Sequence, residues 1–252
     1  MKNGPEVAFS KVPEVTLIFW IIKVAATTLG ETAGDAVSMS MNLGYLAGTG
    51  IFAVFFIAAV VFQIAAKKFH PVIYWTTIVA TTTVGTTLAD FADRSLGIGY
   101  AGGTAVLLAL VLASLFIWHR SLGSIAVDSV SSPKAEMFYW ATIMFSQTLG
   151  TALGDWTADT AGLGYVGAGL VFAGLLALVA LAYRLTRFSR PLLFWMAFIL
   201  TRPLGAVIGD YLDKPVAAGG LALSRYSASA VLCAFIAVCI LLVPQKAAVR
   251  SH

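Results

Sequence analysis

One pattern of four residues occurs four times in this chain, each time with the same internal spacing. A tryptophan is followed ten positions later by a glycine, then four positions further by a glycine or alanine, and immediately by an aspartate. The copies are Trp20/Gly30/Gly34/Asp35, Trp75/Gly85/Ala89/Asp90, Trp140/Gly150/Gly154/Asp155 and Trp195/Gly205/Gly209/Asp210. Such a repeat indicates one supersecondary unit that has been copied, with the copies packed around a common centre.

The apolar content of the chain predicts a membrane protein. Hydrophobic residues make up 59% of the 252 positions and charged residues only 11%, whereas soluble domains are usually about 45–50% apolar. Eight stretches reach the roughly 20 residues that a bilayer-spanning helix needs. They lie near residues 13–37, 44–66, 71–93, 99–119, 136–158, 163–183, 190–212 and 224–243. We therefore predict an all-α polytopic membrane protein with a single transmembrane domain over residues 1–252.

The spans and the repeats together predict how this domain is organised. Each repeat should be a helical hairpin with a short outer turn, and the four hairpins should run parallel in a pseudo-symmetric bundle. We place the repeats at residues 12–69, 70–120, 134–187 and 188–244, with a polar midpoint linker at 121–135. Small residues four apart, such as Gly30 and Gly34, permit close helix contact and place the first helix of each repeat at the centre.

Basic residues are distributed unequally between the two ends of the predicted bundle. The outer end carries only Arg94, Lys214 and Arg225. The opposite end carries Lys2, Lys11, Lys67, Lys68, Arg120, Lys134, Arg184, Arg187, Arg190, Lys246 and Arg250. Because Lys and Arg are retained on the cytoplasmic side of a membrane, we expect both termini to be cytoplasmic. The basic residues at the cytoplasmic end account for the net charge of +4, so this charge does not indicate a nucleic-acid partner, and none is expected.

Acidic residues gather at the outer ends of the four motif-bearing helices. Eight of the twelve carboxylates lie there, namely Glu31, Asp35, Asp90, Asp93, Asp155, Asp159, Asp210 and Asp213. Thr28, Thr83 and Thr148 fall on the same helix faces. Because an intramembrane carboxylate costs about 2.5–3.5 kcal/mol on insertion scales, the four motif aspartates favour a functional site. Two structural alternatives stay open: hydrogen bonding to a neighbouring repeat, and, for the remaining aspartates, helix ends in solvent.

Two basic residues lie within the predicted spans. Arg202 occupies a deep position at which the other three copies carry uncharged residues, and we expect it to pair with one or more carboxylates. Lys23 follows Trp20 by one turn, near enough to the cytoplasmic end for its ammonium to reach the membrane surface. The four motif tryptophans near the same boundary are expected to act as interfacial anchors.

The motif also carries a family resemblance. The eight residues that end in the aspartate read TLGETAGD, TVGTTLAD, TLGTALGD and PLGAVIGD. This Thr-x-Gly-x-x-x-Gly/Ala-Asp run resembles the mark of a bacterial integral membrane protein family built from four copies of a short repeat of unknown function. The fourth copy departs from it, with Pro203 in place of threonine. The resemblance implies a multi-pass protein of the bacterial inner membrane and no particular substrate.

Carboxylates on apolar helices favour binding of a cation. Carboxylates that converge in a low dielectric cannot all be ionised, so they can also carry protons. Oxygen ligands without cysteine or histidine suit hard cations such as Mg²⁺, Mn²⁺ or Ca²⁺. We therefore expect a transporter for a hard cation, for example a divalent metal such as manganese, coupled to protons. The expected metal ligands are Asp35, Asp90, Asp155 and Asp210; the cation is substrate, and no resident cofactor is expected.

Other functions use the same residues and stay open. An organic-cation transporter would add cation–π contacts from the aromatic rings, and a passive cation channel would need both ends to open at once. An intramembrane aspartyl hydrolase requires one specific pair of catalytic aspartates. Four equivalent aspartates recur here instead, so an enzyme is not expected. The expected partners are the lipid bilayer and a small cation, and a homo-oligomer is an open alternative.

Overall fold

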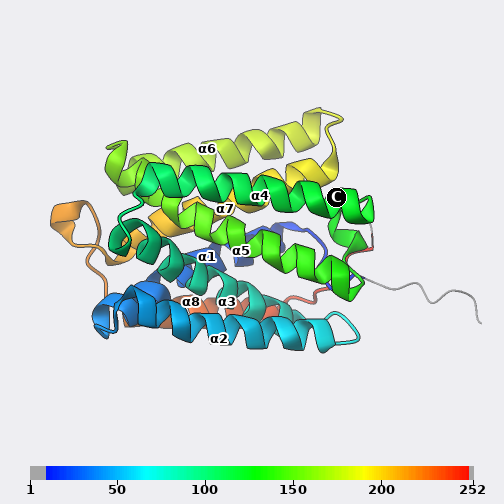
Figure 1. The fold of residues 1–252 in the computed structure, drawn as a ribbon, viewed down its shortest axis with the longest axis horizontal. Coiled ribbons are helices and arrows are strands. Elements are labelled where there is room, and N and C mark those ends of the chain that lie inside the picture. Colours follow the sequence, from blue (N-terminus) through cyan, green and yellow to red (C-terminus); the bar gives the residue numbers. More distant parts are fainter. Residues whose placement is uncertain (1–9, 250–252) are drawn as a thin grey trace, which may run out of the picture.

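The computed structural model describes residues 10–249, which form a bundle of helices (Figure 1). Within these residues there are eight long α-helices. They are α1 (Leu17–Asp35), α2 (Gly44–Ala65), α3 (Pro71–Asp90), α4 (Tyr100–Leu122), α5 (Pro133–Asp155), α6 (Gly164–Leu185), α7 (Arg190–Asp213) and α8 (Arg225–Leu242). The prediction of an all-helical chain with eight helices is confirmed. Lys2 and Arg250, which contribute to the predicted charge asymmetry, lie outside the described residues.

Several of these helices could cross a membrane. By length and composition, six candidate spans qualify: Leu17–Ser40, Tyr45–Ala65, Tyr100–Leu122, Gly164–Leu185, Arg190–Asp213 and Arg225–Leu242. Helices α3 and α5 are of similar length but do not qualify: α3 is rich in threonine, and α5 carries Lys134, Glu136, Gln147 and Asp155, and most of these side chains are buried. The even-numbered helices expose many large apolar side chains. An apolar surface of this extent is typical of a membrane or protein interface.

The four odd-numbered helices form the centre of the bundle. Helix α1 packs against α3, α3 against α5, α5 against α7, and α7 against α1, which closes a ring. The first motif glycine of each helix faces the next helix so closely that an added Cβ would overlap it. The contacts are Gly30–Thr82, Gly85–Gln147, Gly150–Arg202 and Gly205–Thr27. The prediction that small residues place these helices at the centre is confirmed.

Each even-numbered helix packs mainly on the odd helix of the next repeat. Helix α2 lies on α3, α4 on α5, α6 on α7, and α8 returns to α1. The two helices of a repeat follow each other as predicted for a hairpin, but they make few contacts with each other, so the helices of one hairpin pack mainly on other repeats. Each odd helix buries two faces against its neighbours in the ring, and the face that remains is covered by the preceding repeat. This interlocking joins the four copies into one closed bundle.

The first three odd helices change geometry directly after the motif aspartate. Each continues into a five-residue π-helical turn, Ala36–Ser40, Phe91–Ser95 and Trp156–Thr160. Such turns are rare and often lie at functional sites. The chain then reaches the next helix through a glycine with positive φ, as at Gly99 (φ 75°), where a side chain would be strained. In the fourth repeat α7 stays α-helical to Asp213, which matches its different sequence.

Chain segments near both termini close the end of the bundle that lies opposite the motif aspartates. The Ala248 amide donates to the Val12 carbonyl at 2.8 Å. The midpoint linker joins them, because the Lys11 amide donates to the Val130 carbonyl at 3.0 Å. The Lys11 ammonium also lies 2.7 Å from the buried carboxylate of Glu136 on α5. Three segments that are distant in sequence thus cover this end together.

An aromatic cluster lies just inside the covered end. Trp75, Trp140 and Trp195 are buried, and the hydroxyls of Tyr74 and Tyr139 are 2.6 Å apart between α3 and α5. The expected role as interfacial anchors is therefore wrong for these three tryptophans, because their rings pack between helices instead of facing outward. The cluster fills the ring of odd helices at this level.

Candidate functional site

The ring of odd helices encloses four successive layers of equivalent residues. From the aromatic cluster outward they are Lys23/Ile78/Ile143/Phe198, Thr27/Thr82/Gln147/Arg202, Glu31/Thr86/Thr151/Ala206 and Asp35/Asp90/Asp155/Asp210. Every one of these side chains is buried. Residues four apart share one face of a helix, so each odd helix contributes one continuous inner stripe. Polar groups therefore extend along the inside of the ring as far as the motif aspartates.

Arg202 joins all four odd helices. Its Nη2 donates to Glu31 of α1 at 2.9 Å, to Thr86 of α3 at 2.6 Å, and to the hydroxyl of Thr151 of α5. On α7 itself the equivalent position is Ala206, which leaves room for the guanidinium. The Nε and Nη1 atoms of Arg202 have no hydrogen-bond partner within residues 10–249. Arg202 thus pairs with Glu31 and not with the motif aspartates.

Lys23 lies one layer further from the aspartates. Its side chain is 0% exposed, and its Nζ lies 4.2 Å from the centroid of the Phe198 ring. No hydrogen-bond acceptor contacts this ammonium in the part of the chain that the structure describes. The expectation that Lys23 reaches the membrane surface is wrong, because the terminal segments and the linker cover this end. The side-chain amide of Gln147 also has no partner among those residues, and unsatisfied buried groups of this kind are costly.

The motif aspartates of the second and third repeats share one basic side chain. Arg94 follows Asp90 by one turn, and its Nε lies 3.0 Å from Asp90 Oδ1. Its Nη2 reaches across to α5 and donates to Asp155 at 3.0 Å. The Arg94 side chain is 29% exposed, so this bridge lies at the outer mouth of the ring.

The fourth and first repeats form the matching pair. Lys214 Nζ lies 3.0 Å from Asp210 and 2.5 Å from Asp35. Burial disfavours the charged ammonium, but the carboxylates of Asp210 and Asp35 outweigh this effect and raise the pKa of Lys214 above its usual value. Arg225, at the start of α8, adds a second cation: its Nε lies 2.9 Å from Asp213 and its Nη2 lies 3.7 Å from Asp35.

Glu31, Asp35 and Asp210 form the group best suited to bind a metal. One carboxylate oxygen of each lies within 4.8 Å of the others, and all three residues are buried. Asp35 Oδ1 accepts no hydrogen bond from the described residues. Several carboxylate oxygens are the ligands that hard cations prefer. Arg202 and Lys214 already contact this group, so a cation would bind there by exchanging with at least one basic side chain.

Other predicted site residues lie elsewhere. The hydroxyls of Thr28, Thr83 and Thr148 donate to carbonyls one turn earlier in their own helices. A buried hydroxyl commonly donates to the nearest backbone acceptor in this way, and the assisting role of these threonines in cation binding stays a prediction. Asp93 is buried against α4, and neither of its carboxylate oxygens has a partner in residues 10–249. Asp159 is exposed and makes no ion pair in the described chain.

Three basic residues of the candidate site do not follow from the motif. Arg94, Lys214 and Arg225 bridge the carboxylates, although the sequence places them only as charges at the outer end. For the first two a signal was present, since each follows a motif aspartate by four residues, a spacing that brings side chains together on a helix. Arg225 lies 12 residues after Asp213, and no spacing rule predicts that contact.

The fold and the site define a class of protein: an all-helical bundle of four repeats that surround buried, ion-paired carboxylates. Residues 18–69, 73–124, 138–189 and 193–243 each match the family described as Repeat of Unknown Function (DUF347). The chain belongs to this family, and the predicted membership with four repeat copies is confirmed. No curated protein and no solved structure matches the chain.

Proposed function

We propose that this protein is a membrane transporter for a hard cation, such as the divalent metal Mn²⁺, coupled to protons. The observation that carries the proposal is the group of Glu31, Asp35 and Asp210, whose oxygens come within 4.8 Å of one another inside the bundle. Carboxylates without cysteine or histidine favour hard cations over Cu⁺ or Zn²⁺. Asp90 and Asp155, the second acidic pair of the ring, contribute negative charge at the same level.

The charge balance at the outer end supports a cation as the substrate. Six buried carboxylates face three basic side chains there. The carboxylates are Asp35, Asp90, Asp93, Asp155, Asp210 and Asp213, and the basic residues are Arg94, Lys214 and Arg225. If all nine groups were ionised, the cluster would carry three more negative than positive charges, and this excess is unfavourable for buried groups even though most of the aspartates share a basic partner. Protons or a bound cation would restore the balance, and this links substrate binding to proton release.

In this proposal Lys214 is an exchangeable counterion. Its ammonium occupies oxygens of Asp35 and Asp210 that a cation needs, and its side chain is 12% exposed. A cation that enters between these aspartates displaces the ammonium toward the outer solution, and the ammonium returns when the cation leaves. Because either the ammonium or the cation contacts them, Asp35 and Asp210 keep a positive counterion throughout the exchange.

The packing supports a carrier over a passive channel. Arg202 contacts three neighbouring helices across the centre of the ring, and the aromatic cluster and terminal segments cover the other end. Movement of a cation through the ring therefore requires these contacts to rearrange. Rocking of the first two repeats against the last two would expose the site to each side in turn, as in other transporters built from repeats.

The ion pairs do not support an aspartyl hydrolase. In such a dyad two aspartates share a proton, because like charges at short distance cannot both be ionised. Here a basic group stands between the aspartates of each pair, Arg94 in one and Lys214 in the other. The aspartates of each pair thus contact a basic side chain between them and do not share a proton directly, an arrangement that suits ion exchange better than acid–base hydrolysis.

We place the bundle in the bacterial inner membrane with the aspartate end outside. Six helices have the length and composition for a span. Exposed basic residues gather at the opposite end, where α2, α4 and α6 finish; they include Lys67, Lys68, Arg120, Arg184 and Arg187. The positive-inside rule then puts this end and both termini in the cytoplasm.

The proposal can be tested with purified protein in liposomes. Wild-type protein should take up Mn²⁺ against a proton gradient, and Mn²⁺ should raise its unfolding temperature, because a ligand that binds only the folded state stabilises it. Asp35→Asn should lose both effects. Asp159→Asn is the matched control, since Asp159 is exposed and lies outside the paired carboxylates. Uptake by the Asp35 variant at the wild-type rate, or a wild-type protein that no hard cation stabilises, would refute the proposal.

A further inference from the structure

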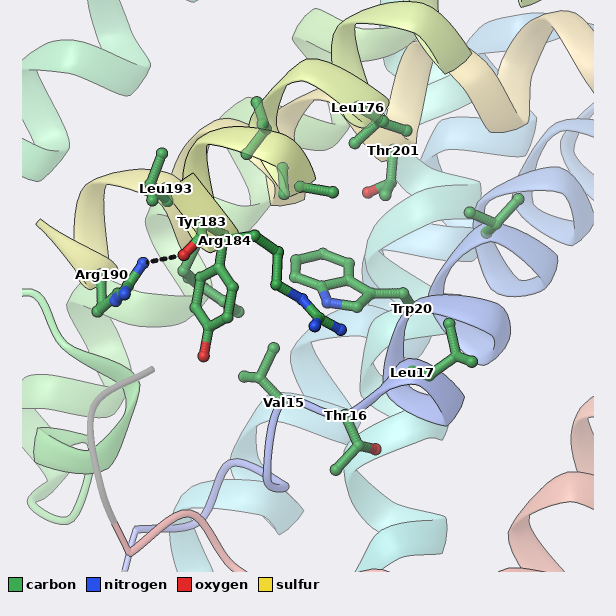
Figure 2. Close-up of a pocket in the computed structure, with 15 residues that line it drawn as sticks. Val15, Thr16, Leu17, Trp20, Leu176, Tyr183, Arg184, Arg190, Leu193 and Thr201 are labelled. Atoms are coloured by element: carbon green, nitrogen blue, oxygen red, sulfur yellow. Dashed lines mark hydrogen bonds between the residues drawn. The ribbon is translucent and has the colours of Figure 1, made fainter. Parts of the chain in front are cut away.

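An apolar groove opens on the side of the bundle between α1 and α6, both of which pack on α7 (Figure 2). It encloses about 530 Å³ and extends along these helices from Thr16 and Arg190 to Val24 and Thr201. Most of its lining is apolar, with the Trp20 ring on one wall. The elongated shape and the apolar walls suit a hydrocarbon chain.

Two arginines lie at the end of this groove nearest the covered end of the bundle. Arg190 Nη1 donates to the Tyr183 carbonyl at 2.6 Å, and its guanidinium lies 4.2 Å from the centroid of the Tyr183 ring. Arg184 is exposed, and its side chain has no ion pair or hydrogen bond in the described chain. In Figure 2 the Arg184 side chain extends into the groove toward the side on which Trp20 lies. A positive charge without a partner therefore projects over apolar walls.

A second groove serves as an internal comparison. The fourfold arrangement repeats the same setting between α3 and α8, both of which pack on α1, and a cavity of about 350 Å³ lies there. It too has a motif tryptophan, Trp75, in its wall, but no charged residue lines it. The arginines are thus particular to the first groove and are not a general property of the repeat.

We propose that the groove between α6, α1 and α7 binds an anionic phospholipid. The phosphate lies against Arg184 and Arg190, and one acyl chain lies along Trp20, Leu176 and Val24. The charge complementarity selects this occupant, because basic pockets between helices at the cytoplasmic side of a membrane attract acidic headgroups. The inference rests on the proposed membrane location and orientation and is independent of the transported substrate.

Native mass spectrometry of protein released from lipid nanodiscs tests this site. With nanodiscs of phosphatidylcholine and a minor fraction of phosphatidylglycerol, the wild type should retain one phosphatidylglycerol. In the variant with Arg184→Gln and Arg190→Gln its affinity should fall about tenfold or more, since each basic group near a charged lipid contributes to binding. Arg120→Gln, which removes an exposed charge at the end of α4, should retain the lipid.

A groove-filling variant separates a lipid from a free anion. Ala180→Trp keeps both arginines but places a ring where the acyl chain lies, so it should lose the phosphatidylglycerol, and inorganic phosphate should not displace the lipid from the wild type. Equal retention by the double arginine variant and the wild type would overturn the inference. So would retention by Ala180→Trp, or a dimer whose formation excludes lipid from the groove. None of these outcomes depends on Mn²⁺ uptake, so the inference and the proposed transport fail separately.

Discussion

The buried pair of Arg202 and Glu31 allows the interactions at the centre of the ring to be measured. Their side chains are 1% and 3% exposed, and Arg202 Nη2 lies 2.9 Å from Glu31 Oε2. Arg202→Met keeps a long unbranched side chain, but it leaves Glu31 without a charge partner and removes the donor to Thr86 and Thr151. Because breaking a buried pair by removing one partner costs about 3–5 kcal/mol, we expect the free energy of unfolding to fall by roughly that amount.

A double variant distinguishes lost charge pairing from lost packing. Combining Arg202→Met with Glu31→Gln removes both charges, and replacement of a whole buried pair is often close to neutral. We therefore expect the second substitution to restore about 0.5–3 kcal/mol. Unfolding in mixed micelles, followed by fluorescence of the buried tryptophans, gives both values, and Lys134→Met at the exposed start of α5 should leave the curve unchanged. A stable Arg202 single variant, or losses that simply add in the double variant, would refute the reasoning.

Three further predictions use the same unfolding assay. Gly205→Ala should lower the free energy of unfolding by about 1–3 kcal/mol, because its Cβ would overlap the Thr27 side chain and force α7 away from α1. The control is Gly174→Ala on α6, where an added Cβ meets nothing within 4 Å, and it should not lower the free energy of unfolding. Lys23→Met should stabilise the protein, since it removes a buried charge that has no ionic partner in the described chain, and a loss of stability would contradict this. Lys214→Gln should lower stability without metal and enlarge the stabilisation by Mn²⁺; an unchanged metal response would argue against the exchange of counterions.

The sequence predicts the parts of the fold that depend on local pattern. Span positions follow from apolar length, and the central ring follows from the spacing of Gly30 and its equivalents, since only small residues allow helices to approach so closely. The gathering of acidic residues at one end also follows from their common register. These features depend on periodicity along single helices, which can be read without knowing which helices are neighbours.

The features that the sequence does not predict depend on neighbour choice. Nothing in an even-numbered helix indicates that it packs on the odd helix of the next repeat, because one apolar face fits either partner. The burial of Lys23 depends on segments near both termini that meet only in the folded chain. Thr83 shares a helix face with Asp90, yet its hydroxyl donates to the backbone carbonyl of Val79. Side-chain direction thus follows from competition among nearby acceptors and not from register alone.

The differences between the repeats locate the candidate site within the ring. Glutamate occurs at its layer only in the first repeat, as Glu31, and arginine occurs at its layer only in the fourth, as Arg202. The first and fourth repeats meet where α1 packs against α7, so these residues and Lys214 accumulate on that side.

The two basic bridges also cross the boundary between the halves of the chain. Arg94 links the second repeat to the third through Asp155, and Lys214 links the fourth to the first through Asp35. No other ion pair with an aspartate of the motif joins the two halves within residues 10–249, apart from the longer contact of Arg225 with Asp35. In the proposed transporter, a cation that displaces Lys214 would replace this bridge with its own bonds to Asp35 and Asp210, so its binding would change how the two halves are held together. This coupling is the step that alternating access requires, because substrate binding must change how one half is held against the other.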